Sequence, residues 1–362
     1  MVHPTGAPIA VRDGARRRRG AAALVTAVAI AGSGVGAVLT VRHVGAHRIG
    51  DAVRSADPKW LGLAMALMCV SMASRAVSWR AILSAAVAPV RVGLAGVLRA
   101  TSIGVLLSAT APGRVGEAAR AMVVARRLPA APDGGAALAV VLGTIVSQTI
   151  INLAALVVLG AIAVGGTVSA GGRGGALPLT AIVPAAALLL VVALPAALAR
   201  LARRRRGRTV RRLHTAAVRI RAGLAVFRSP RMALEAVGAQ SGAWALQWLS
   251  CYALLVAFGF AHQGGLRAAA AVLFAVNMTA AVPVTPANIG VFQAACVAVL
   301  SASYAIPVAD ALGYGVVLQI VEVATAVLMG VPALLREGLS LRVARHQTGE
   351  WSPQPPETSW TG

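Results

Sequence analysis

Two arginines and a glutamate stand close together in the stretch ATAPGRVGEAAR, residues 109–120. If the residues after Pro112 form a helix, Glu117 lies three positions from both Arg114 and Arg120 and on the same face. The planar donor fork of arginine and the free N–H groups at a helix start both suit a phosphate group. The alternative is an ion network that only packs helices together. The stretch therefore predicts either an anion site or a structural ion cluster.

The surroundings of this stretch are apolar, because 58% of the 362 residues are hydrophobic and 12% are charged, with a mean hydropathy of +0.77. These values are typical of an integral membrane protein. Apolar runs long enough to cross a hydrocarbon core of about 30 Å recur along the chain, and their alanine, leucine and valine favour helices. We therefore predict an all-α polytopic membrane protein. An arginine at mid-bilayer depth costs roughly 2.5 to 3.5 kcal/mol, so Arg114 and Arg120 need partners.

Two kinds of apolar segment occur along the chain. Six are long enough for full transmembrane helices, at about residues 21–41, 60–79, 136–165, 177–199, 236–259 and 311–335. We interpret the first as a retained signal anchor, because it is too long for a cleaved signal and lacks a clear cleavage site. Two further segments, at about 93–125 and 268–303, are interrupted at APGRVGE and VPVTPANIG. Each interrupted segment predicts a broken-helix hairpin.

The distribution of arginine predicts how the chain lies in the membrane. The loop at 200–235 carries twelve arginines, and loops of this kind remain on the cytoplasmic side. This places both termini of a cell-membrane protein in the cytoplasm and the loop at 166–176 outside, although the basic loop at 42–59 opposes the assignment. The two hairpins then enter the membrane from opposite faces. The chain would comprise a basic N-terminus at 1–20, a membrane domain at 21–338 and a disordered tail at 339–362.

The two breaks share a spacing, Pro112-x-x-x-Gly116 and Pro286-x-x-x-Gly290, and a polar residue follows each. Together with the opposed hairpins, this spacing predicts an inverted repeat of about 21–165 and 177–335. Inverted repeats are typical of transporters that bind their substrate where broken helices meet. The residues predicted to break the helices are Pro112, Gly113 and Pro286. The residues predicted to form the substrate site are Arg114, Gly116, Glu117, Arg120, Asn288, Gly290 and Gln293.

Further polar residues follow helical stripes, each on one helix face. The two sets are Thr144, Gln148 and Asn152 at i, i+4 and i+8, and Gln240, Trp244 and Gln247 at i, i+4 and i+7. The stripes predict either hydrogen bonds between helices or the lining of a groove for a headgroup. Glu322 lies midway along the last span with Gln319 one turn earlier, and an acid at that depth is a candidate for proton coupling.

Three stretches resemble the lysylphosphatidylglycerol synthetase transmembrane region, a flippase-like membrane family. LLSATAPGRVGEAARAMVVARR is similar to its Pro-x-Arg-x-Gly-Glu-x-x-Arg signature, PVTPANIGVFQAACVAVL to its second break, and RAVSWRAIL at 75–83 to an early helix with Arg and Trp. The resemblance spans most of 20–338. Ala287 and Asn288 stand where the family commonly has paired glycines, and Gln293 stands where a glutamate is common. The resemblance implies the handling of a phospholipid or a polyprenyl-phosphate-linked lipid, and it implies that the predicted substrate site binds a lipid headgroup.

Two functions are compatible with these residues. The first is a flippase-like transporter, without chemistry of its own, for an anionic phospholipid or a polyprenyl-phosphate-linked lipid. The second is a non-catalytic membrane subunit of an aminoacyl- or glycosyl-lipid transferase system with a separately encoded catalytic partner, because fewer than thirty residues follow Leu335. We expect no metal or cofactor, since no metal-ligand cluster or nucleophile motif is present. We assign the net charge of +23 to loops that attract anionic lipid, and expect no nucleic acid partner.

The predicted orientation can be tested by labelling single cysteines in intact cells with a reagent that does not cross the membrane. A cysteine in the 166–176 loop should label from outside, whereas a cysteine at Thr209, in the arginine-rich loop, should label only after lysis. Labelling at position 209 in intact cells would overturn the orientation.

Overall fold

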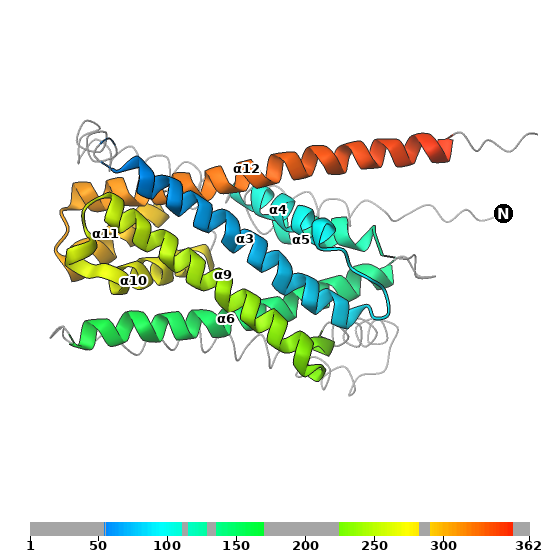
Figure 1. Cartoon of the computed structure of the whole chain (residues 1–362), viewed down its shortest axis with the longest axis horizontal. Helices are drawn as coiled ribbons and strands as arrows, with labels where there is room; N and C mark the ends of the chain where they lie inside the picture. The colour runs from blue at the N-terminus through cyan, green and yellow to red at the C-terminus, as the bar shows by residue number, and fades with distance from the viewer. Residues whose placement is uncertain are drawn as a thin grey trace, which may run out of the picture.

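Helices make up the secondary structure of the described residues in a computed structural model of the chain (Figure 1). This confirms the predicted all-α class. The predicted spans at 21–41 and 177–199, most of the arginine-rich loop and the residues after 349 lie outside the described part. The structure describes Arg54 and the ranges 56–110, 115–128, 135–169, 224–281 and 290–349.

Three helices of the described residues contain segments long and apolar enough to cross a membrane: α3 (Pro58–Ala86), α6 (Gly135–Ser169) and α12 (Val308–Gly349). They cover the spans predicted at 60–79, 136–165 and 311–335. A fourth helix, α9 (Pro230–Ala257), covers most of the segment predicted at 236–259. Among the described helices, α9 lacks a segment as apolar as those of the other three.

Each interrupted segment folds as two helices. The first gives α4 (Leu94–Thr110) and α5 (Val115–Ala125), and the second gives α10 (Ala261–Ala281) and α11 (Val291–Tyr304). α5 has 11 residues and α11 has 14, which at 1.5 Å per residue corresponds to about 17 and 21 Å. Both lengths fall short of a hydrocarbon core of about 30 Å, so neither helix can cross it alone. The breaks at 111–114 and 282–289 lie outside the described residues.

The starts of these helices are marked in the sequence. The Asp57 side chain accepts a hydrogen bond from the Lys59 N–H at 2.8 Å, and Pro58 occupies the first position of α3, where its missing N–H costs nothing. α11 begins after Gly290, whose φ of 87° suits glycine and disfavours other residues. The Gln293 side chain accepts from the Gly290 N–H at 2.7 Å and stabilises this start.

The central contact of the bundle joins α3 and α9, which lie side by side and antiparallel (Figure 1). The N–H of Asp57, before α3, donates at 3.0 Å to the carbonyl oxygen of Ala257, at the end of α9. Serine and alanine side chains let the two backbones approach closely. Three buried serine hydroxyls donate across the interface to backbone carbonyls at 2.8–2.9 Å: Ser71 to Ala243, Ser78 to Ala236, and Ser250 to Ala64.

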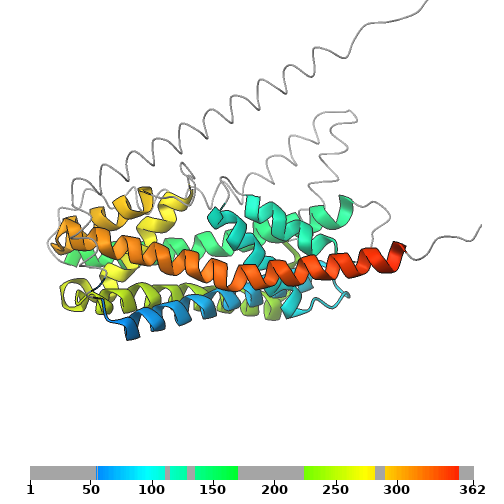
Figure 2. The same ribbon diagram turned by 90° about the horizontal axis from the view of Figure 1, so that it is seen from above.

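The remaining helices pack around this central pair. The helices form two parts of the chain, α3 to α6 and α9 to α12. α6 lies against α10, and α12 lies against α4, so the long helix that ends each part contacts the hairpin of the other part. The α4–α5 and α10–α11 hairpins lie toward opposite ends of the bundle (Figure 1 and Figure 2). Arg127, just after α5, forms an ion pair with Glu337 of α12. The two parts of the chain therefore interlock and do not form separate bundles.

α4 and α5 pack closely where Gly104 of α4 meets Gly116 of α5. A Cβ added at Gly116 would overlap the carbonyl oxygen of Gly104, whereas a Cβ added at Gly62 would meet no atom within 4 Å. We expect Gly116→Ala to lower the melting temperature in detergent, since overpacking costs about 1–3 kcal/mol. Gly62→Ala, the matched control in α3, should keep or raise the melting temperature because alanine favours helix. Equal melting temperatures for the two variants would contradict the close approach.

Candidate functional site

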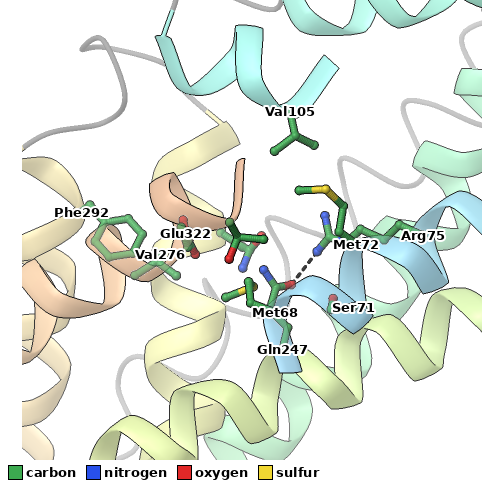
Figure 3. Close-up of a pocket in the computed structure, with 11 residues that line it drawn as sticks. Met68, Ser71, Met72, Arg75, Val105, Gln247, Val276, Phe292 and Glu322 are labelled. Carbon is green, nitrogen blue, oxygen red and sulfur yellow. Dashed lines mark hydrogen bonds between the residues drawn. The ribbon is translucent and has the colours of Figure 1, made fainter. Parts of the chain in front are cut away.

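A cavity of about 240 Å³ lies between α3, α9, α12 and the two hairpins (Figure 3). Both parts of the chain contribute to its wall. The lining residues are Met68, Ser71, Met72 and Arg75 of α3, Val105 of α4, Gln247 of α9, Val276 and Asn277 of α10, Phe292 of α11, and Glu322 and Thr325 of α12. Most of these side chains are apolar or neutral, and two are charged.

Arg75 is held on the wall of this cavity by three contacts. A terminal guanidinium nitrogen donates to the side-chain oxygen of Gln247, drawn as a dashed line in Figure 3. The guanidinium carbon lies 5.6 Å from the centre of the Trp244 ring, and the Arg75 backbone carbonyl accepts from the Gln148 amide at 3.4 Å. A guanidinium has five N–H donors, and among the described residues Gln247 takes one of them. The other donors make no hydrogen bond to a described residue, and Arg75 lines the cavity.

Glu322 lines the same cavity from α12. The ion pairs formed among the described residues lie elsewhere, one within α5 and one between the end of that hairpin and α12. Arg75 and Glu322 are therefore not in ion-pair contact, and the cavity presents a positive and a negative side chain separately. Within the described residues, no three histidine, cysteine, aspartate or glutamate side chains gather where they could hold a metal ion.

Arg120 lies outside this cavity, in a network on α5. Its guanidinium pairs with Glu117, as the three-residue spacing predicts, and donates to the Gln148 side chain at 3.0 Å. The guanidinium carbon also lies 4.7 Å from the centre of the Trp79 ring. The Arg120 side chain is 12% exposed. These three contacts join Arg120 to α3, α5 and α6, and a role of Arg120 in headgroup binding stays a prediction.

The polar stripe of α6 makes hydrogen bonds to neighbouring helices. Thr144 accepts from the indole N–H of Trp79, in α3, at 3.1 Å. Asn152 accepts from two side chains of α9, Gln240 at 2.8 Å and Trp244 at 2.9 Å. None of these side chains lines the cavity. Their hydrogen bonds therefore join helices to one another, whereas Gln247, from the α9 stripe, reaches the cavity.

Gln293 joins the start of α11 to α12. Its side-chain oxygen accepts from the Gly290 N–H, and its nitrogen donates to the side-chain oxygen of Gln319. Gly290 and Gln293 are therefore both used in contacts within the protein, and neither lines the cavity. The neighbouring Phe292 does. The second hairpin thus reaches the cavity through an aromatic side chain.

Five of the seven residues predicted to bind a headgroup lie in the described part of the chain, and the other two, Arg114 and Asn288, lie outside it. Of the five, Gly116 packs closely on Gly104 where α5 begins. Any role of these residues in headgroup binding stays a prediction. The three residues predicted to break the helices, Pro112, Gly113 and Pro286, also lie outside the described residues.

Arg75 is a cavity residue that the spacing of the polar residues did not select. One signal in the sequence points to it, because an arginine in the middle of an apolar span is costly and marks a functional position by default. The apolar lining residues, such as Met68 and Phe292, carry no such signal, since their types resemble those of any packed helix.

The comparison with known families agrees with this architecture. A sequence model of the lysylphosphatidylglycerol synthase transmembrane region matches residues 24–330. The chain belongs to this family. Membership in the lysylphosphatidylglycerol synthase transmembrane family, together with the apolar helices, makes the chain a membrane protein associated with lipid modification. It also confirms the resemblance drawn from the three sequence stretches. A comparison with curated proteins gave no match.

The contacts of Arg120 predict a structural role that can be measured. Arg120→Ala removes a hydrogen bond to a charged group and leaves Glu117 unpaired, which we expect to cost about 1.5–3 kcal/mol and to lower the melting temperature in detergent. Arg91→Ala, at an exposed arginine before α4, is the matched control and should leave the melting temperature unchanged. If both variants melted at the same temperature, Arg120 would have no structural role.

Proposed function

We propose that this chain binds an anionic phospholipid or a polyprenyl-phosphate-linked lipid within the membrane and moves it across. The observation that carries the proposal is Arg75, which lies in a membrane-spanning helix and faces a cavity. An arginine at that depth costs roughly 2.5–3.5 kcal/mol on insertion scales, and its planar donor fork matches a phosphate group. The lipid-modification family supports a lipid as the ligand.

The arrangement of helices supports an inverted repeat. α3 to α6 and α9 to α12 follow the same order of helix, hairpin and helix. Two hydrogen bonds between α3 and α9, Ser71 to Ala243 and Arg75 to Gln247, join residues that are 172 positions apart. A shift of 172 positions also takes Ser78 to Ser250 and Ala64 to Ala236. A two-fold rotation that relates these residues therefore carries the Ser78–Ala236 hydrogen bond onto the Ser250–Ala64 hydrogen bond. This pattern is expected for a two-fold axis that passes beside Arg75 and Gln247.

The same proposal includes six full spans and two re-entrant hairpins in the cell membrane, with both termini in the cytoplasm. The short lengths of α5 and α11 support re-entrant hairpins. The position of the hairpins toward opposite ends of the bundle supports their entry from opposite faces (Figure 1). Broken helices that meet between repeats are typical of substrate sites in transporters.

The alternative function is a non-catalytic membrane subunit of an aminoacyl- or glycosyl-lipid transferase system. The family's association with lipid modification supports it equally. In both functions the chain carries out no chemical step, and in the alternative a separately encoded transferase would do so. A proton-coupling role for Glu322 belongs to the transporter, and its position on the cavity wall is compatible with that role.

Lipid movement by the purified protein in vesicles would distinguish the two functions. Arg75→Lys keeps the charge needed for insertion and loses the two-pronged fork, so transport of a fluorescent phospholipid should fall at least about tenfold. Arg91→Lys, at an exposed arginine outside the helices, should transport at the wild-type rate. Unchanged transport by the Arg75→Lys protein would contradict the assignment of phosphate to this residue. Wild-type protein that moves no lipid but copurifies with a transferase would favour the subunit.

A further inference from the structure

The charged side chains of the cavity, Arg75 and Glu322, stand on different helices and do not pair with each other (Figure 3). The guanidinium donates to Gln247 instead, and no described side chain donates a hydrogen bond to the Glu322 carboxyl. Arg75 and Glu322 attract each other electrostatically across the cavity, but neither is in an ion-pair contact with a described residue. Among the described residues, the contacts of these two side chains leave part of their hydrogen-bonding capacity unused.

The size of the cavity limits what can satisfy these two charges. About 240 Å³ is smaller than the pockets of about 300–1,000 Å³ that enclose drug-sized ligands, so it suits a headgroup and not a whole lipid. A phosphate alone would attract Arg75 but be repelled by Glu322 in the same small space. An ammonium alone would be attracted by Glu322 but repelled by Arg75. A headgroup that carries both charges satisfies both side chains.

We infer that the cavity recognises a phospholipid headgroup in which a phosphate is joined to a primary ammonium, with the phosphate at Arg75 and the ammonium at Glu322. The inference rests on the proposed function, from which it keeps a lipid phosphate at Arg75, and it replaces the anionic phospholipid of that proposal by a zwitterionic one. It gives Glu322 a contact with the ligand in place of proton coupling. The methionine side chains Met68 and Met72 offer an apolar surface for the part of the lipid next to the headgroup.

The lining also favours a primary over a quaternary ammonium. A primary ammonium has three N–H donors for the Glu322 carboxylate, whereas the quaternary ammonium of choline has none. Quaternary ammonium groups are held by cages of aromatic rings, and Phe292 is the single aromatic residue among the described lining residues. An ethanolamine-type headgroup therefore fits better than choline.

The test measures binding of three phospholipids with the same labelled acyl chains to purified full-length protein in detergent. Their headgroups are ethanolamine, choline and glycerol, and the ethanolamine lipid should bind most tightly. Glu322→Gln replaces a charge-assisted bond by a neutral one, so it should weaken ethanolamine-lipid binding about tenfold without weakening the glycerol lipid. Glu235→Gln, at an exposed glutamate of α9, is the matched control and should leave all three affinities unchanged.

Other outcomes separate this inference from the proposed function. Tighter wild-type binding of the glycerol lipid, unaffected by Glu322→Gln, would overturn the zwitterionic ligand and leave an anionic lipid as the substrate. Failure to bind all three lipids would overturn both. Soluble phosphoethanolamine should compete only weakly, because it lacks the apolar part, and equal competition would overturn the assignment to a lipid. The three-lipid comparison on the wild-type protein needs no variant, so it decides the question even if Glu322→Gln does not fold.

Discussion

The contact between α3 and α9 is the constraint on which the rest of the structure depends. A helix in hydrocarbon already forms all of its backbone hydrogen bonds. The hydrophobic effect therefore does not drive two such helices together. Serine hydroxyls supply the attraction here, because they donate to carbonyls of the facing helix at intervals along the interface. Arg75 and Gln247 meet in the same interface. The cavity therefore lies beside the most extensive helix–helix contact of the described residues.

Polar side chains elsewhere in the bundle divide into two groups according to their partners. Asn152 and Thr144 are met by donors from neighbouring helices, and these contacts fix where α6 stands. Arg120 is also engaged from several sides, by a carboxylate, an amide and an indole ring. The charges on the cavity wall differ because their partners among the described residues are incomplete. A partly satisfied charge in a membrane protein points to a ligand or a moving part.

The spans at 60–79, 136–165 and 311–335 and the two interrupted segments could be predicted because both depend on local composition. Runs of about twenty apolar residues define a span, and proline with glycine marks a break. The Glu117–Arg120 pair followed from helical spacing alone. The cavity could not be predicted, because Arg75 and Gln247 meet across 172 positions. Spacing along one helix also could not decide which stripe residues join helices and which reach the cavity, since that depends on the facing helix.

The pairing of Arg75 with Gln247 limits how two related halves can diverge. In the proposed two-fold arrangement, Arg75 and Gln247 occupy equivalent positions. If both positions held the same residue type, two identical side chains would face each other. Two arginines would repel each other, and two glutamines would leave the cavity without its cation. A duplicated gene could therefore acquire a charged centre only by losing sequence identity between its halves at this point. Natural substitutions at the two positions should consequently be accepted together and not one at a time.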